Sequence, residues 1–303
     1  MTRILYFNIT FACNNRCVFC FSHSTFFDNT YTIKENDVVK AIKKYNISSF
    51  DRVILNGGEP TLHPGLLNIA RLLYETGAEI VLYTNGRKLK NKAYCNELVK
   101  MVDRVVIPIH GEESVHDFIT QKKDSYSDTI CGIGNVLMAD NRKLELKFIV
   151  TDDMIHSFFS ITDFLLHHNF NPYSIVLTGV VPTMVSQINQ VSPPSSNDLG
   201  EYISYQLNNL LQVFSGSIKL FDCELCHLSE DIRAYIYALP LKNNNHLKYD
   251  YYYFDGKYNT GKLIHYNNNR ECKECSWINI CRRISDACIV LEIGQGYKKI
   301  VLE

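Results

Sequence analysis

Short apolar runs recur along the first two thirds of the chain, and each is separated from the next by a stretch with helical spacing. We predict six strands, at Ile4–Thr10, Arg52–Asn56, Glu79–Thr84, Arg104–Ile109, Leu144–Val150 and Tyr173–Thr178. The stretches between and after them predict helices at about Thr32–Tyr45, Pro64–Glu75, Asn91–Met101, Ser127–Asp140, Ile155–Asn169 and Asn197–Phe214. A capping box, Thr32 with Glu35, would start the first helix.

Alternating strands and helices, with strands that are mostly continuous in apolar residues, are typical of a parallel sheet covered by helices. Six strand-helix units fall short of the eight of a closed barrel. We therefore predict an α/β fold, a partial (β/α)6 TIM-like barrel. From residue 217 the pattern changes to a Cys-, Tyr- and Asn-rich segment with little helical spacing. We expect two domains, the barrel at 1–216 and a small metal-held domain at 217–303.

Charge and hydropathy exclude several classes of protein. Lys and Arg number 31 against 32 Asp and Glu, so no basic field indicates a nucleic-acid partner. The first residues lack the pattern of a signal peptide, and no apolar run has the length of a membrane span. We expect a cytoplasmic protein with no membrane or nucleic-acid partner. The sequence does not indicate an oligomeric state.

The chain has 11 cysteines, and in a reducing compartment clustered cysteines bind metal more often than they form disulfides. Nine fall into two groups: Cys13, Cys17 and Cys20 near the start, and Cys223, Cys226, Cys272, Cys275, Cys281 and Cys288 near the end. The other two, Cys95 and Cys131, stand alone, and we expect both to be small buried hydrophobic residues.

The front cysteines follow the first predicted strand with the spacing C-x3-C-x2-C. Iron-sulfur clusters are normally held by four thiolates, so a local set of three would leave one iron open to another ligand. Zinc is the alternative, but zinc ligands usually come as C-x2-C pairs with a second pair. A second pair is not close to this group in the sequence.

Other unusual residues also follow predicted strands. Gly57-Gly58-Glu59-Pro60 follows the second, Thr84-Asn85-Gly86 the third, His110-Gly111 the fourth and Thr178-Gly179 the sixth. In parallel strand-helix folds the active site forms where the strands end at their carboxyl side. All these residues are therefore expected on one rim of the barrel, together with the front cysteines.

The cysteine spacing with Phe19 before Cys20, followed by Gly-Gly-Glu-Pro after the second strand, resembles the radical S-adenosylmethionine (SAM) superfamily. The resemblance covers the first two thirds of the chain. It implies a [4Fe-4S] cluster on Cys13, Cys17 and Cys20, with SAM bound to the open iron. It also implies reductive cleavage of SAM to a 5′-deoxyadenosyl radical that takes a hydrogen atom from the substrate, and an electron donor such as flavodoxin or ferredoxin.

The resemblance also implies the residues that contact SAM. The loop Gly57, Gly58, Glu59 and Pro60 would hold the methionyl amine, with glycines that let backbone approach a ligand closely. Phe19 would pack near the adenine, and further candidates are Thr84, Asn85, His110 and Val180. The alternatives are a simple tight turn for the glycines, a core aromatic for Phe19, and a structural histidine for His110 or for the nearby His116.

The back cysteines resemble the auxiliary-cluster extensions called SPASM and twitch domains, through the spacing C-x2-C-x5-C at Cys272, Cys275 and Cys281. The full SPASM pattern has a cysteine where Ser285 stands, and the next one here is Cys288. The resemblance implies one auxiliary [4Fe-4S] cluster on Cys226, Cys272, Cys275 and Cys281, or two clusters. Cys223 and Cys288 would be additional ligands, or one of them a free thiol that donates hydrogen to a substrate radical. A zinc ribbon is the alternative.

For the function, we expect a radical SAM enzyme in natural product biosynthesis, acting on a peptide or a small molecule. The first hypothesis is maturation of a ribosomal peptide (a RiPP) by crosslinking, epimerisation or thioether formation. An alternative is an epimerase or dehydrogenase of an aminoglycoside or other small carbohydrate. A non-enzymatic metal-binding protein is the second alternative. The sequence does not fix the substrate.

Overall fold

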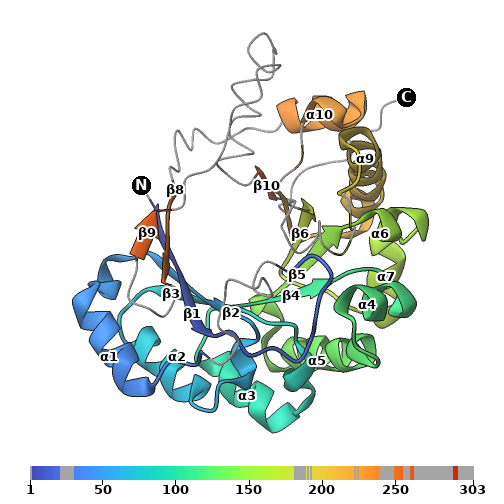
Figure 1. The fold of residues 1–303 in the computed structure, drawn as a ribbon. Coiled ribbons are helices and arrows are strands. Elements are labelled where there is room, and N and C mark those ends of the chain that lie inside the picture. The colour runs from blue at the N-terminus through green and yellow to red at the C-terminus, as the bar shows by residue number, and fades with distance from the viewer. Residues whose placement is uncertain are drawn as a thin grey trace.

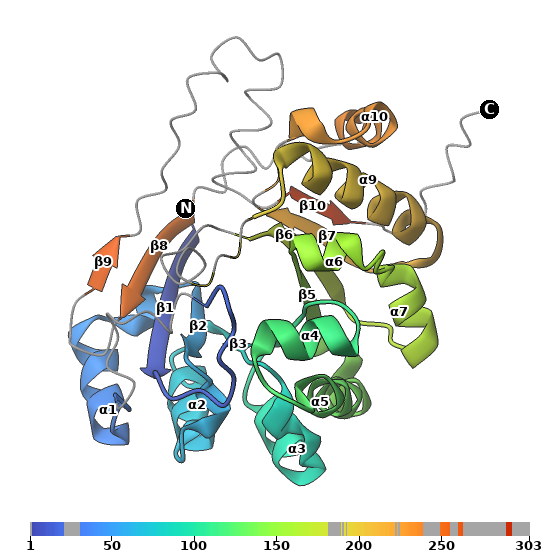
Figure 2. The same ribbon diagram turned by 45° about the vertical axis from the view of Figure 1, so that its right-hand side comes forward.

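The structure is a computed structural model, and it describes residues 2–20, 31–180, 189, 191, 193–221, 223, 225–238, 249–254, 260–262 and 289–292. Its described strands form one curved sheet with helices around the outside (Figures 1 and 2). The cysteines at 272, 275, 281 and 288 lie outside the described residues, so the predicted auxiliary site stays a prediction.

The sheet begins with seven parallel strands, which pair in chain order. They are β1 (Thr2–Thr10), β2 (Arg52–Gly57), β3 (Glu79–Tyr83), β4 (Arg104–Ile109), β5 (Leu144–Val150), β6 (Ser174–Gly179) and β7 (Ser217–Phe221). At the β1 edge, β8 (Tyr249–Phe254) is added in parallel and β9 (Thr260–Lys262) antiparallel to it. At the other edge β10 (Ile289–Glu292) pairs antiparallel with β7. The predicted α/β partial barrel is confirmed.

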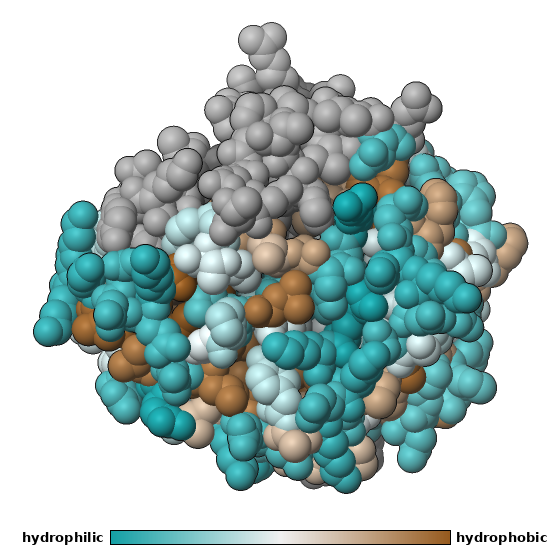
Figure 3. All heavy atoms as spheres, turned by 60° about the horizontal axis from the view of Figure 1, so that its bottom comes forward, coloured by the Kyte–Doolittle hydropathy of each residue, from teal (hydrophilic) through white to brown (hydrophobic). Residues whose placement is uncertain are grey.

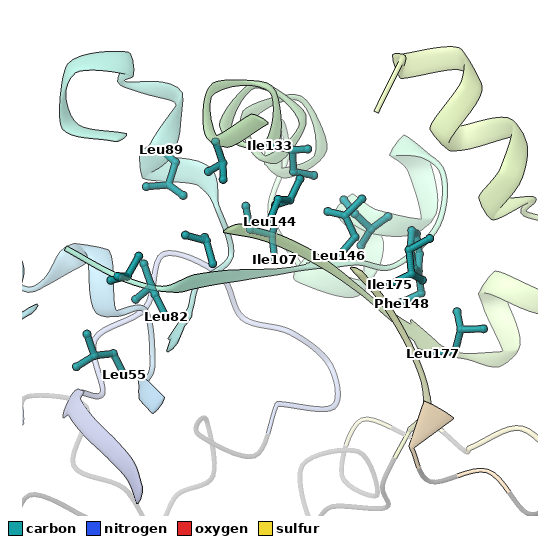
Figure 4. Close-up of a cluster of buried hydrophobic side chains, with 14 of the residues drawn as sticks. Leu55, Leu82, Leu89, Ile107, Ile133, Leu144, Leu146, Phe148, Ile175 and Leu177 are labelled. Carbon is teal, nitrogen blue, oxygen red and sulfur yellow. The ribbon is translucent and has the colours of Figure 1, made fainter. Parts of the chain in front are cut away.

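Helices cover the outer face of the sheet: α1 (Glu35–Lys44), α2 (Leu66–Tyr74), α3 (Lys92–Lys100), α4 (Glu113–Thr120), α5 (Ser125–Asp140), α6 (Asp152–His156), α7 (Ile161–His168), α9 (Ser196–Val213) and α10 (Glu230–Ala238). The main hydrophobic core lies between these helices and the strands. Figure 4 shows side chains such as Leu82, Ile107 and Leu146 on the helix side of the sheet, near Ile133 of α5. This burial drives the strands and helices to pack together.

The predicted strands agree closely with the observed ones, but the helices differ in three places. Thr32 does not cap α1, because its hydroxyl lies 2.9 Å from that of Thr10 in a β-bridge and the N-cap is Lys34. The helix predicted at Ile155–Asn169 is interrupted at Phe158, whose φ of 53° is left-handed, so two helices form. Helix α4 was not predicted.

Some residues after 216 still contribute strands to the sheet of the barrel. β7 pairs in parallel with β6, and β8 pairs in parallel with β1, so both extend the same sheet. The division into 1–216 and 217–303 stays a prediction.

In the described part of the chain, no helix combines the length and apolarity needed to cross a bilayer. The face shown in Figure 3 is mostly hydrophilic, with small scattered hydrophobic patches. Isolated patches of this kind are normal on a protein surface.

Candidate functional site

The front cysteines lie on a loop that leaves the carboxyl end of β1 and is fixed by backbone hydrogen bonds on two sides. On one side, Gly58 N–H donates to Thr10 O at 2.7 Å and Glu59 N–H donates to Ala12 O at 2.8 Å. On the other, Arg16 and Val18 N–H donate to the last turn of α4 at 2.9 Å each. The loop is therefore anchored to the Gly-Gly-Glu-Pro segment as the strand-end positions predicted.

The two glycines of that segment are required by the cysteine loop itself. Gly57 has a φ of +138°, which side-chain-bearing residues rarely adopt. A Cβ on Gly58 would lie 2.5 Å from the carbonyl oxygens of Phe11 and Ala12. The backbone at these two glycines therefore lies close to the start of the cysteine loop, and the predicted contact of this segment with SAM stays a prediction.

Glu59 joins the ends of two strands through its buried carboxylate. One oxygen accepts from Thr61 N–H at 3.0 Å and from the hydroxyls of Thr61 and Thr84 at 2.6 Å each. The other accepts from Asn85 N–H at 2.7 Å. Burial raises the pKa of the Glu59 carboxyl, and the four hydrogen bonds oppose that shift. Glu59, Thr84 and Asn85, predicted as separate SAM contacts, therefore form one connected unit.

A second connection to the cysteine loop was missed in the sequence. Arg87, in the short helix η4 (Arg87–Lys90), donates to Asn14 O at 2.9 Å and to the side-chain oxygen of Asn15 at 3.0 Å. It also pairs with Asp128 of α5 at 3.0 Å, and Asn85 donates to the side chain of Asn14 at 2.7 Å. The only available signal was the position of Arg87 directly after the predicted turn Asn85-Gly86.

The thiols themselves suit a cationic metal site. Burial raises the pKa of Cys13 to about 12, although a hydrogen bond from Asn15 N–H opposes the shift. Burial also raises the pKa of Cys17 well above its usual value. The charges of the nearby Cys20 and Cys13 raise it further. The buried thiols of Cys13 and Cys17 would ionise beside positive charge, which bound iron would supply.

Two histidines lie beside the cysteine loop. The ring of Phe19 meets that of His110 edge-on at 5.4 Å, and His110 lies 5.2 Å from His116, centroid to centroid. Burial lowers the pKa of His110 well below its usual value and that of His116 to about 4, so both rings are neutral. His110 Nδ1 is buried and has no hydrogen-bond partner among the described residues, whereas His116 is close to Ser125 at 3.4 Å.

The other predicted positions divide between rim and core. Pro60 is buried at the start of the short helix η3 (Pro60–Leu62), and Val180 is buried directly after β6. Cys223, two residues after β7, packs in the hydrophobic core, and Cys226 is exposed.

The two isolated cysteines differ from each other. Cys95 is buried as predicted, but Cys131 is exposed on α5, so the prediction of a buried residue there was wrong. That face of α5 points to solvent, and the helical spacing alone did not show which face is covered.

Comparison with known proteins agrees with this site. Residues 7–143, which include the cysteine loop, the Gly-Gly-Glu-Pro segment and His110, match the model of the radical SAM superfamily. The chain thus carries a radical SAM domain over residues 7–143. That family implies a [4Fe-4S] cluster and SAM as its cofactors.

Among curated proteins, the chain is similar to a probable GTP 3′,8-cyclase of Sulfurisphaera tokodaii, with 32% identity over 161 residues, covering 52% of this chain and 50% of the relative. A probable GTP 3′,8-cyclase of Saccharolobus islandicus (strain Y.N.15.51) is 27% identical over 199 residues, covering 64% of this chain and 62% of the relative. The chain therefore matches only about half to three fifths of the length of these relatives.

Among solved structures, anSMEcpe with bound AdoMet matches with a TM-score of 0.63 and 15% identity, covering 97% of this chain and 93% of that one. SuiB of Streptococcus suis bound to S-adenosylmethionine matches with a TM-score of 0.62 and 12% identity, covering 93% of this chain and 72% of that one. At these identities the matches show the shared fold.

Proposed function

We propose that the chain is a radical SAM enzyme that holds a [4Fe-4S] cluster on Cys13, Cys17 and Cys20 and acts on a ribosomal peptide. Hydrogen abstraction would lead to a crosslink, an epimerised residue or a thioether. The observation that carries the proposal is the cysteine loop, anchored by backbone hydrogen bonds to Gly58 and Glu59. When bound and reduced, the cluster with SAM supplies a 5′-deoxyadenosyl radical; an external donor such as flavodoxin or ferredoxin supplies the electron.

The chain's own residues have three tasks in this proposal. Glu59 holds the ends of β2 and β3 in register beside the cysteine loop. Arg87 fixes Asn14 and Asn15 within the loop. Phe19 and His110 form the wall of the rim between the loop and β4, where SAM would lie, and the neutral His110 ring offers a hydrogen-bonding nitrogen there.

A peptide substrate is supported by the fold of the structural neighbours, one of which was solved with a Cp18Cys peptide and another with the precursor peptide SuiA. A nucleotide is the second candidate, because the curated relatives are named GTP 3′,8-cyclases. We further propose an auxiliary [4Fe-4S] cluster on Cys226, Cys272, Cys275 and Cys281.

The test is anaerobic incubation of the reconstituted enzyme with SAM and a reductant, with deuterated candidate peptides or deuterated GTP added singly. The proposal predicts 5′-deoxyadenosine that carries deuterium from a peptide. Deuterium transfer from GTP and from no peptide would replace the peptide assignment with the nucleotide one. Absence of 5′-deoxyadenosine in every sample would refute the radical SAM activity. For the auxiliary cluster, Cys275→Ala should lower the iron content; unchanged iron would contradict it.

A further inference from the structure

The cysteine loop carries an exposed cation. Arg16, inside the C-x3-C spacing, has an exposed side chain, and its N–H donates to Thr120 O at the end of α4 at 2.9 Å. Figures 1 and 2 show the blue segment after β1 running across to α4. Phe19, by contrast, packs edge-on against the ring of His110 at the rim. The loop therefore presents Arg16 to solvent and Phe19 to the end of β4.

Two lysines follow in the turn between α4 and α5. Thr120 is the last residue of α4, and Lys122 and Lys123 come directly after it in the turn, both exposed. The turn is fixed by the carboxylate of Asp117, which accepts hydrogen bonds from two backbone N–H groups, in the turn and at the start of α5, at 2.8 Å each. Because Arg16 is hydrogen-bonded to Thr120, the backbone positions of all three cations lie close together. We call Arg16, Lys122 and Lys123 the cationic patch.

The surface around this patch has more positive than negative charge. None of the three cations takes part in an ion pair in the part of the chain that the structure describes. The turn itself contains one acidic residue, Asp124. Asp128, in the first turn of α5, is shared by Arg87 at 3.0 Å and Lys90 at 2.6 Å, so two cations meet one carboxylate there as well.

A fixed cationic surface beside the cysteine loop suits an acidic protein partner. Opposite charges speed the encounter of two proteins and orient them on each other. The proposed reaction needs one electron from an external donor, which has to reach the cluster from outside the chain. Arg16 is next to Cys17 in the sequence, and consecutive Cα atoms are about 3.8 Å apart. A protein that binds Arg16 is therefore adjacent to a predicted cluster ligand.

We propose that the cationic patch is the docking surface for an acidic one-electron carrier protein. This inference rests on the proposed function, because a cluster on the front cysteines is what requires such a partner. In the complex, one electron passes from the carrier, which is oxidised, to the cluster, which is reduced, and no covalent bond forms or breaks. A carrier fits better than an acidic peptide substrate, because the patch is on the exposed part of the loop, whereas Phe19 packs at the rim.

The experiment uses the full reconstituted chain with SAM and measures the rate of 5′-deoxyadenosine formation with different reductants. Two are acidic carriers, a flavodoxin and a ferredoxin, each kept reduced by NADPH and a reductase at a concentration that limits the rate. The other is excess dithionite, which needs no docking surface. The quantity compared is the ratio of the carrier-driven rate to the dithionite-driven rate.

We expect Lys122→Gln/Lys123→Gln to lower this ratio by about 5-fold at low salt with at least one carrier, and added Arg16→Gln to lower it by about 10-fold or more in total. Added salt should lower the wild-type ratio as well, because it screens exposed charges. Lys43→Gln/Lys100→Gln, at exposed positions in the last turns of α1 and α3, is the charge-matched control and should keep the wild-type ratio. Iron content and melting temperatures establish that each variant is intact.

Unchanged ratios in both patch variants, or failure of both carriers to drive cleavage by the wild type, would overturn the inference alone. Polyglutamate that slows the dithionite-driven and carrier-driven reactions equally would assign the patch to an acidic peptide and overturn the carrier assignment. Absence of 5′-deoxyadenosine with dithionite would refute the proposed function. Calorimetric titration of the same samples with oxidised carrier reports docking separately: we expect binding about 10-fold weaker without the patch, and equal binding would contradict it.

Discussion

Replacing Glu59 by Gln tests whether this side chain holds the rim together. The buried carboxylate accepts four hydrogen bonds, three at one oxygen and one, from Asn85 N–H, at the other. A Gln carbonyl in the first position keeps three of them. The amide nitrogen of Gln then replaces the carboxylate oxygen that accepted from Asn85 N–H. Two hydrogen-bond donors face each other there, and the buried Asn85 N–H loses its acceptor.

The expected cost follows from this count. A buried donor without a partner costs about 1–3 kcal/mol, and the remaining hydrogen bonds lose their charge assistance. Relief from burying a carboxylate offsets part of this. We expect Glu59→Gln to lower the free energy of unfolding by about 2 kcal/mol, which corresponds to a melting temperature lower by roughly 5 °C in a chain of this size.

The assay is thermal and urea unfolding of the metal-free chain, with iron content after reconstitution as a second readout. Glu97→Gln, at an exposed position of α3, is the matched control and should change stability by less than about 0.5 kcal/mol. Because Glu59 is next to the backbone contact with Ala12, we also expect less iron bound to Glu59→Gln. Equal stability of the two variants would refute the reasoning.

Three further predictions concern the same region. Asp128→Asn leaves the buried Arg87 charge without its carboxylate and should lower the free energy of unfolding by about 2 kcal/mol. Asp37→Asn, in an exposed ion pair, is the control and should lower it by about 0.5 kcal/mol or less. Similar losses of stability for the two variants in urea unfolding would contradict this. The low pKa of His116, about 4, means that the unfolded chain takes up a proton first as the pH falls below 6.5, so stability should drop by about 3 kcal/mol by pH 4. His116→Gln should flatten that dependence, and an unchanged slope would exclude His116 as its cause. Gly58→Ala should lower the free energy of unfolding by about 1–3 kcal/mol and reduce the iron retained, because the new methyl group would collide with the cysteine loop. A melting temperature equal to that of the wild type would contradict this, since it would show that the loop shifts to make room for the methyl group.

The sequence predicted the strands well because each combines an apolar run with a strand-end motif. Cys13, Gly58 and Asn85 could be assigned to one rim without coordinates, since parallel strands end at the same edge. The part played by Arg87 could not be predicted, because its partners Asn14 and Asp128 are distant in the sequence and the ion pair depends on how η4 packs against α5.

The barrel interior also escaped prediction. The run Leu144-Glu-Leu-Lys-Phe-Ile-Val150 reads as a mostly apolar strand, and nothing in it shows which face is inward. Only the register with β4 and β6 places Glu145 and Lys147 on that face. The break at Phe158 was missed for a similar reason, since an aromatic residue with left-handed backbone has no sequence signal comparable to glycine.

The central claim is that the front cysteines form a SAM-cleaving site, and one comparison tests it most directly. Wild type, Cys17→Ala and Cys95→Ala are reconstituted anaerobically with iron and sulfide, reduced in the presence of SAM, and assayed for 5′-deoxyadenosine. Cys95 is the matched control, because it is a buried thiol away from the rim. The account predicts 5′-deoxyadenosine from wild type and Cys95→Ala, and none from Cys17→Ala; cleavage of SAM by Cys17→Ala at the wild-type level would contradict it.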